Sequence, residues 1–248
     1  MVKILAKAPP GLVTQFPITQ AVVDRSQDGC IYGLGDDVFV IHKSGFCSYV
    51  GELNSVERFL FLINSQKVPN YIHIYDPCQK MVDVFSEHPG TYATRLRKRI
   101  SLIYNKKVAI NLLHHEGFSL KYVDEQCLGS LSVFNLNLDH KFWSSSQDFI
   151  QNSYATIVLN SQEEPVSICY SAASALGRAE IDVYTVEMCR GLGLAKLAVS
   201  GFINRCLDAG IVPNWDCFED NQPSLKTAMG LGFKVVKEYS FLSIFKNK

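Results

Sequence analysis

The residues with the clearest capacity for chemistry form a short glycine-rich loop in the second half of the chain. Its members are Arg190, Gly191, Leu192, Gly193, Leu194 and Ala195. Glycine lets a backbone approach a ligand closely, and the N–H groups of a first helical turn have no acceptor within the helix. Together with the positive end of the helix dipole, those donors form an anion site that suits a diphosphate. The alternative is a tight structural turn between a strand and a helix.

Two other phosphate-binding motifs do not match this loop. The dinucleotide fingerprint Gly-x-Gly-x-x-Gly requires a third glycine where the chain has Lys196. A P-loop requires Gly-Lys-Ser or Gly-Lys-Thr after a four-residue gap, and the loop does not continue in this way. Neither of these nucleotide-binding motifs therefore explains the loop.

Hydrophobic periodicity and breaker residues predict the elements that position the loop. In the second half, strands are predicted over residues 118–123, 154–159, 166–173, 181–186, 212–218 and 235–245, the last as one or two strands. Helices are predicted over residues 193–207 and 222–231, with Gly210 just past the end of the first. The segment 124–152 is expected to be helical or irregular. The loop thus lies between a strand and a helix.

The first half of the chain predicts a series of short strands and helices. Strands are expected over residues 38–42, 71–75, 99–104 and 107–113. Asn54 is expected to cap a helix, with Glu57 completing a capping box, and a second short helix is expected over residues 76–85. No internal repeat is visible in the sequence. This half carries no recognisable chemical motif.

The segment from Glu180 onward resembles a known enzyme family. The strand end at Thr185, the RGLGLA loop and Trp215 in Pro-x-Trp-Asp-Cys are followed by Asn221-x-x-Ser224 and then by Gly-Phe, in the family's order and spacing. This part of the chain resembles the GNAT N-acetyltransferases, and within them the zwittermicin-resistance type. The hairpin that contains EPVSICYSAAS extends the resemblance back to about residue 118.

The resemblance implies an α/β (α+β) protein with the GNAT fold, in which helices flank a central mixed, mostly antiparallel sheet. We expect a GNAT acetyl-CoA-binding catalytic domain at residues 116–248 and an N-terminal α/β lobe at residues 1–115 that shapes the acceptor site. The implied reaction moves an acetyl group from acetyl-CoA to the primary amine of a small molecule by direct attack in a ternary complex. Two alternatives are a protein or peptide amine as acceptor and a catalytically inactive CoA-binding regulatory module.

The resemblance also implies a set of acetyl-CoA contacts. The backbone of Tyr184, Thr185 and Val186 would pair with the pantetheine arm, and the 190–195 loop would bind the pyrophosphate. Asn221 would bond the pantetheine. Asn221 is also predicted to cap the helix that follows it, and both roles are compatible. Arg190 has the alternative of a surface position at the start of a helix.

Catalysis by direct attack requires that an ammonium acceptor first loses a proton, and a carboxylate can accept it. Glu180, Asp182 and Tyr184 alternate along one face of the predicted strand 181–186. We prefer Glu180 as the base and place Asp182 second; the alternative is that both are solvated edge charges. Many GNAT enzymes have a tyrosine that acts as a general acid toward the thiolate, at the position where this chain has Ala228.

The departure at Ala228 leaves Ser224, Tyr239 or solvent as the proton donor to the leaving thiolate. Ser224 has the alternative of a position in the first turn of a capped helix. His114 and His115 precede every motif, and we expect surface or core positions for them. The missing tyrosine is the feature that favours the inactive-module alternative.

Composition excludes several other classes of protein. Hydrophobic residues make up 47% and charged residues 19%, as in globular domains. Lys plus Arg and Asp plus Glu number 24 each, so the basic excess of a nucleic-acid binder is missing, and the cluster at residues 95–99 is expected to be a solvated face. No window reaches the ~20 apolar residues of a membrane helix, and the N-terminus does not resemble a signal peptide.

The cysteines indicate a reducing compartment. Eight are scattered along the chain without a Cys-x-x-Cys pair. Metal sites place at least two ligands close in sequence, and secreted disulfide frameworks are shorter and denser. We therefore expect a cytoplasmic protein without a metal, and without nucleic-acid or membrane partners. The oligomeric state stays open, with a homodimer as one alternative.

Overall fold

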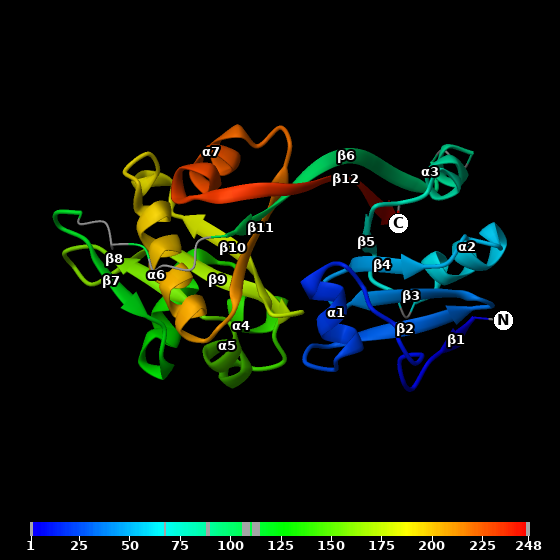
Figure 1. Ribbon diagram of the computed structural model, residues 1–248, viewed down its shortest axis with the longest axis horizontal. Coiled ribbons are helices and arrows are strands. Elements are labelled where there is room, and N and C mark those ends of the chain that lie inside the picture. The colour runs from blue at the N-terminus through cyan, green and yellow to red at the C-terminus, as the bar shows by residue number, and fades with distance from the viewer. Residues whose placement is uncertain (1, 67, 88–89, 106–109, 111–114, 247–248) are drawn as a thin grey trace. The chain divides into compact units, whose positions relative to one another are not determined.

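The computed structural model describes the chain apart from residues 1, 67, 88–89, 106–109, 111–114 and 247–248 (Figure 1). It divides into two compact units. Unit 1 comprises Met1–Arg99 with Glu238–Lys248, and unit 2 comprises Ile100–Lys237. Two long strands, β6 (Tyr92–Tyr104) and β12 (Phe233–Lys246), pass from one unit into the other. Unlike the predicted division at residue 115, this one gives unit 1 the end of the chain, because β12 pairs there with a strand of unit 1.

Unit 1 is a sheet with helices between its strands. Its elements are β1 (Lys3–Ile4), α1 (Pro17–Val23), β2 (Gly29–Leu34), β3 (Asp37–His42), β4 (Phe46–Val50), α2 (Val56–Asn64), β5 (Tyr71–Tyr75) and α3 (Gln79–Ser86). Strands β1 to β4 pair antiparallel in sequence order, and β4 pairs parallel with β5. The C-terminal part of β12 then pairs antiparallel with β5. The core lies between this sheet and α2, with Phe39, Phe59, Leu62, Ile72 and Ile74 fully buried.

The start of α2 corrects one expectation. Ser55, not Asn54, is the N-cap, and its Oγ accepts the backbone N–H of Arg58 at 3.3 Å. Asn54 is the residue before this N-cap, and its backbone N–H donates to Asp37 Oδ2 at 2.9 Å. This long-range bond fixes Asn54 outside the helix, which the local sequence does not reveal. The predicted strands 38–42 and 71–75 match β3 and β5.

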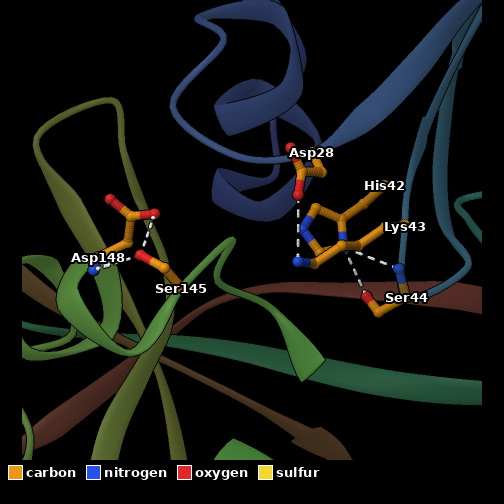
Figure 2. A network of polar contacts seen from close by, with 6 residues as sticks. All are labelled: Asp28, His42, Lys43, Ser44, Ser145 and Asp148. Atoms are coloured by element: carbon orange, nitrogen blue, oxygen red, sulfur yellow. Dashed lines mark hydrogen bonds and ion pairs between the residues drawn. The ribbon is translucent and has the colours of Figure 1, made fainter. Parts of the chain in front are cut away.

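Strand β6 is longer than expected, because the predicted strand 99–104 forms its end. The expected strand 107–113 lies almost entirely outside the described residues. The turn between β3 and β4 is fixed by short polar contacts (Figure 2). Lys43 Nζ lies 3.2 Å from Asp28 Oδ2, and the N–H of Ser44 donates to His42 Nδ1 at 3.1 Å.

Unit 2 carries the predicted loop on the later strands of the same sheet. Its elements are β7 (Ser119–Tyr122), the 3₁₀ segment η1 (Glu125–Phe134), α4 (Leu138–Lys141), α5 (Ser146–Asn152), β8 (Thr156–Leu159), β9 (Pro165–Ala175), β10 (Arg178–Thr185), η2 (Glu187–Cys189), α6 (Leu194–Asp208), β11 (Val212–Phe218) and α7 (Gln222–Leu231). Strands β7 to β10 pair antiparallel, and β10 pairs parallel with β11. The expected mixed, mostly antiparallel sheet flanked by helices is confirmed.

Helix α6 is the main cover of this sheet, and it lies across β8, β9 and β10 (Figure 1). Leu194, Leu197 and Phe202 recur at helical spacing and are buried against the strands. A Cβ at Gly201 would lie 2.6 Å from the side chain of Leu120, so glycine permits the close approach of α6 to β7. The segment before β8 is shaped locally, since Ser145 Oγ accepts the N–H of Asp148 at the start of α5 (Figure 2).

His73 lies in an aromatic cluster of unit 1. Its ring centroid is 5.4 Å from those of Phe46 and Phe241, and its Nδ1 is 3.0 Å from Ser243 Oγ. Burial, followed by the positive charges of Arg99 and Arg97, lowers the pKa of His73 to about 4. The imidazole is therefore neutral in the folded protein at neutral pH.

Acidification is expected to destabilise unit 1 through His73. The unfolded chain has an ordinary histidine pKa of about 6.5, so it binds the proton first as the pH falls. The contribution of His73 to the free energy of unfolding is fully present above about pH 6.5 and is lost as the pH falls towards about 4. The loss is at most about 3 kcal/mol, and it is smaller where solvent screens the partly exposed ring. Urea unfolding followed by circular dichroism across this pH range measures the loss. The His73→Phe variant should show a shallower pH dependence, and identical slopes for the two proteins would contradict the prediction.

Candidate functional site

The site is built where β10 and β11 part. The parallel pairing covers three positions, Arg178 with Val212, Ala179 with Pro213 and Glu180 with Asn214. Beyond them β10 runs on to Thr185 and β11 to Phe218, and these described stretches form no further pair. The register between β10 and β9 also shifts between Glu180 and Ile181. From that point, the edge of β10 that faced β11 carries backbone groups that are not used in the sheet.

The other edge of β10 stays firmly attached to β9. Thr185 Oγ1 lies 2.8 Å from Ser167 Oγ, and Ser167 Oγ donates to the Tyr184 carbonyl at 3.1 Å. The N–H of Val186 donates to the Val166 carbonyl at 2.9 Å. Because these bonds hold the strand end in place, its free edge is a rigid set of donors and acceptors. An extended chain molecule can pair with such an edge as an added strand does.

The glycine loop follows directly and opens α6. Gly191 and Gly193 have φ values of +80° and +79°, in the left-handed region that glycine adopts without strain. Gly193 is the N-cap, and its carbonyl accepts the N–H groups of Lys196 and Leu197 at 3.0 and 3.2 Å. The N–H groups at the very start of the helix have no acceptor within it, and they coincide with the positive end of the helix dipole. A helix start of this kind can bind an anion, and diphosphate binding by this loop stays a prediction.

Flanking side chains orient this loop. Leu194 is buried in the core of unit 2, and Ala195 is partly buried, whereas Leu192 is half exposed. Arg190 is exposed, and its Nε donates to the Thr185 carbonyl at 3.3 Å. It caps the end of η2 and does not start α6, so its alternative as a helix-start residue is wrong. Arg190 ties the loop to the end of β10.

His115 is a neighbour of the loop that the sequence did not reveal. A Cβ at Gly193 would lie 3.0 Å from His115 Cε1 and 3.6 Å from Nε2. The imidazole therefore lies beside the N-cap of α6, and a side chain at position 193 would crowd it. No local signal marks this contact, because His115 and Gly193 meet through the fold. His114 lies outside the described residues.

The two predicted acidic residues occupy different environments on β10. Glu180 is 7% exposed and lies at the last paired position, opposite Asn214. The carboxylate of Asp182 is partly exposed, accepts the Tyr170 hydroxyl at 2.7 Å and lies 3.4 Å from Lys141 Nζ. Asp182 thus has a hydrogen-bond donor and a cation beside it, whereas Glu180 is buried where the strands separate. The expectation of solvated edge charges is wrong for Glu180.

The predicted alternation along β10 is confirmed by contacts on its two faces. Ile181 and Val183 pack with α6 in the hydrophobic core. On the other face, the Tyr184 ring meets Phe134 of η1 at 6.0 Å, and Asp182 meets Lys141 of α4. The segment η1–α4 therefore covers the polar face of β10.

A cavity of about 420 Å³ opens in the segment that covers this face. Its walls include Leu128, Leu131, Leu138 and Phe149, with the amide of Asn135 among them. Pockets for small molecules have volumes in this range.

The start of α7 brings together the remaining predicted residues. The N–H of Ser224 donates to Asn221 Oδ1 at 3.2 Å, so Asn221 caps the helix as expected. Trp215 Nε1 donates to Ser224 Oγ at 3.0 Å. This bond uses a lone pair of the hydroxyl and leaves its hydrogen available to an acceptor. Trp215 comes from β11, immediately beyond the paired positions, so it aligns Ser224 with the parting of the strands.

Removal of the Ser224 hydroxyl tests whether it acts in chemistry or in the cap. If Ser224 donates a proton, Ser224→Ala should lower kcat by roughly 10²-fold with little change in KM for the donor. Thr227→Ala is the matched control, because Thr227 loses a hydroxyl that bonds the Pro223 carbonyl in the same helix. Steady-state kinetics and thermal melting of both variants separate the roles. A lower melting temperature with unchanged kcat would assign Ser224 to the helix alone.

Two further positions bear on the proton donor. Ala228 is fully buried in the core of unit 2, so the place of the usual tyrosine holds no titratable group. Tyr239 belongs to unit 1, where it is buried against Phe16 and Tyr75 with ring distances of 5.0 and 5.9 Å. Among the candidates named from the sequence, Ser224 is the side chain that unit 2 itself supplies.

Comparison with known proteins agrees with this geometry. The family model described as GNAT acetyltransferase matches residues 19–242, most of the chain. The chain belongs to the GNAT acetyltransferase family. A solved GNAT structure, a GCN5-related N-acetyltransferase-like protein from Streptococcus suis, superposes with a TM-score of 0.73 at 23% identity over 93% of each chain. A GCN5-related N-acetyltransferase from Kribbella flavida gives 0.65 at 13% identity over 94% of this chain and 93% of that one. These likenesses confirm the expected GNAT fold.

A curated relative matches part of the chain. It is described as the uncharacterized N-acetyltransferase YdfB of Bacillus subtilis and is 39% identical over 125 residues. The match spans 50% of this chain and 48% of that protein, so the chain aligns with about half of this relative's length. Within the described residues of this GNAT protein, no group of three or more His, Cys, Asp or Glu side chains is arranged to hold a metal ion. None of the helices described is long and apolar enough to cross a bilayer.

Proposed function

We propose that this protein transfers an acetyl group from acetyl-CoA to the primary amine of a small molecule, by direct attack in a ternary complex. The observation that carries the proposal is the loop at residues 190–195, which opens α6 at the end of a strand whose edge is free. Membership of an acetyltransferase family supports the reaction class. The resemblance to zwittermicin-resistance acetyltransferases favours a small amine, and eight free cysteines favour a reducing cytoplasm.

The residues present fit acetyl-CoA, which supplies an activated acetyl thioester. The N–H groups at the start of α6 suit a diphosphate, and Gly191 and Gly193 let the backbone approach it. The free edge of β10 at Tyr184, Thr185 and Val186 suits the amides of a pantetheine arm. Asn221 stands at the start of α7, where its side-chain oxygen is already engaged by Ser224. We propose that Asn221 contacts the arm through its amide NH₂.

Catalysis would come mainly from positioning and from proton removal. Backbone N–H groups on the free edge of β10 would polarise the thioester carbonyl. Glu180 would accept the proton of the acceptor ammonium, directly or through water, because it lies at the parting of the strands. Asp182 would orient the acceptor, since Tyr170 and Lys141 already stabilise its negative charge. Ser224 would donate a proton to the departing sulfur.

A small acceptor is supported by the cavity in the η1–α4 segment. This segment covers the face of β10 that carries Asp182 and Tyr184, and the walls of its cavity combine leucine and phenylalanine side chains with serine and asparagine. A volume of about 420 Å³ accommodates a small organic molecule and is too small for a folded protein surface. The expected contribution of the N-terminal lobe to acceptor selection stays a prediction.

The test is a thiol-release assay with acetyl-CoA and two acceptor panels, one of small primary amines and one of lysine-containing and N-terminal peptides. The proposal expects CoA release that depends on a small amine, with the acetylated amine identified by mass spectrometry. Turnover with peptides alone would assign a protein acceptor. Tight acetyl-CoA binding without turnover on either panel would favour the inactive regulatory module.

A further inference from the structure

Unit 1 repeats the order of elements found in unit 2. In both units a first strand, helical segments and three antiparallel strands lead to a helix, a parallel strand and a second helix. Helix α2 lies between β4 and its parallel partner β5, as α6 lies between β10 and β11. The strands that follow α3 and α7 are exchanged. Strand β12, which follows α7, pairs with β5, and strand β6, which follows α3, neighbours β11. The structure thus holds two copies of one topology without a visible sequence repeat.

The parting of parallel strands is repeated as well. In unit 1, β4 and β5 pair at Phe46 with His73 and at Cys47 with Ile74. Strand β4 then continues to Val50 and β5 to Tyr75, and these described residues do not pair with each other. Unit 1 therefore has its own opening at the position where unit 2 has its donor site.

The loop that leads into α2 is closed to anions by the protein itself. Asp37 is 1% exposed, and its two oxygens accept the N–H groups of Leu53 and Asn54, each at 2.9 Å. A Cβ at Gly51 would lie 2.2 Å from Asp37 Oδ1, so the carboxylate fills the space beside the loop. A buried carboxylate thus occupies the place that a diphosphate would take in the other unit. A second anionic ligand would meet like charge there, and CoA is excluded as the ligand of unit 1.

A cleft of about 230 Å³ nevertheless remains beside the ends of β4 and β5. Its lining residues include the aromatic Phe16, Tyr49 and Tyr75 and the hydroxyl-bearing Thr14 and Ser48. The rings of Phe16 and Tyr75 stack with centroids 3.9 Å apart, which makes one wall rigid. Thr19 joins the two hydroxyls, at 3.0 Å from Thr14 Oγ1 and 2.8 Å from Ser48 Oγ.

An acidic residue lines the cleft. Among the described lining residues, Asp76 is the one with an acidic side chain, and it is exposed directly after β5. Burial raises the pKa of Tyr49 to about 12, and a hydrogen bond with Cys78 and the negative charge of Asp76 add to this effect. Asp76 therefore acts electrostatically on an aromatic ring of the same cleft. A carboxylate beside aromatic rings is the environment that recognises organic cations.

We propose that this cleft of unit 1 binds a small organic cation, a protonated or quaternary amine, through the carboxylate of Asp76 and the ring of Tyr49. The site is separate from the donor site proposed for unit 2 and does not depend on it. Unit 1 would then bind a ligand of its own. Its site corresponds in topology to the proposed acetyl-CoA site of unit 2, but the ligand has the opposite charge.

Equilibrium dialysis of choline against the full chain tests this proposal. Choline should bind saturably, with one site per chain lost in Asp76→Asn and an affinity at least about tenfold above that of its uncharged isostere 3,3-dimethylbutan-1-ol. Asparagine tolerates the φ of +49° at this position, so the variant should fold normally. Asp36→Asn is the matched control, because Asp36 is an exposed acid of unit 1 that does not line the cleft.

Three results would overturn the proposal. Equal binding of choline and its isostere would show that charge is not recognised. Unchanged binding in Asp76→Asn, or equal losses in Asp76→Asn and Asp36→Asn, would show that the cleft is not the site. A loss in Glu180→Gln with none in Asp76→Asn would place the cation in unit 2. Absence of acetyltransfer would bear on the proposed function and leave this binding result unaffected.

Discussion

Titration calorimetry should detect acetyl-CoA binding to the wild-type protein and none to the Gly193→Asp variant. The added carboxylate would stand at the N-cap of α6, against the position of the diphosphate, and it would crowd His115. Like-charge repulsion together with lost backbone contacts is expected to weaken binding by at least about 100-fold, or about 2.7 kcal/mol. Of the predictions for the donor site, this one has the largest expected effect on affinity.

Gly210→Asp provides a matched control for this experiment. Gly210 also has a positive φ, +71°, and its Cβ position is open, but it follows the opposite end of α6. The same substitution there adds the same charge and similar backbone strain, and acetyl-CoA binding should be retained. If Gly193→Asp binds as tightly as Gly210→Asp, the loop is a structural turn. If folded wild-type protein does not bind acetyl-CoA, the proposed function is wrong.

Glu180→Gln is expected to lower kcat by roughly 10²- to 10⁴-fold, the usual contribution of a general base. The amide keeps the size of the side chain but cannot accept the proton of the acceptor. Acetyl-CoA affinity should stay near the wild-type value, since Glu180 lies before the free edge of β10. Activity of the variant should rise with pH more steeply than that of the wild type, because alkaline solution supplies the free amine.

Two comparisons make this result specific. Asp182→Asn should have a smaller effect on kcat, because Asp182 is engaged by Tyr170 and Lys141. Glu219→Gln removes an exposed carboxylate after β11 and should leave the kinetics unchanged. Unchanged kcat in Glu180→Gln, with a large loss in Asp182→Asn, would transfer the role of base to Asp182.

Local features of the sequence determined much of unit 2. The glycines at 191 and 193 predicted a loop whose backbone can approach a ligand closely, and alternation along residues 180–184 predicted which side chains share a face. Asn221 predicted a helix cap, because capping depends on residues three positions apart. These signals are read from neighbours in the chain, and they therefore do not require knowledge of the fold.

The tertiary structure alone decided the contacts between distant residues. The sequence could not show that His115 lies beside Gly193, that Trp215 orients Ser224, or that Asp37 displaces the helix cap from Asn54 to Ser55. It also concealed the pairing of β12 with β5, and with it the second copy of the topology.

The physical reason for this division lies in what each level of structure depends on. Turn, cap and periodicity signals arise from steric and hydrogen-bonding preferences within a few residues. Strand partners and side-chain contacts depend on which surfaces fold together, and many apolar sequences can satisfy one topology. Unit 1 keeps the order of elements of unit 2, but the oxygens of Asp37 accept the N–H groups of the segment before α2, and the order of elements alone does not reveal such a contact.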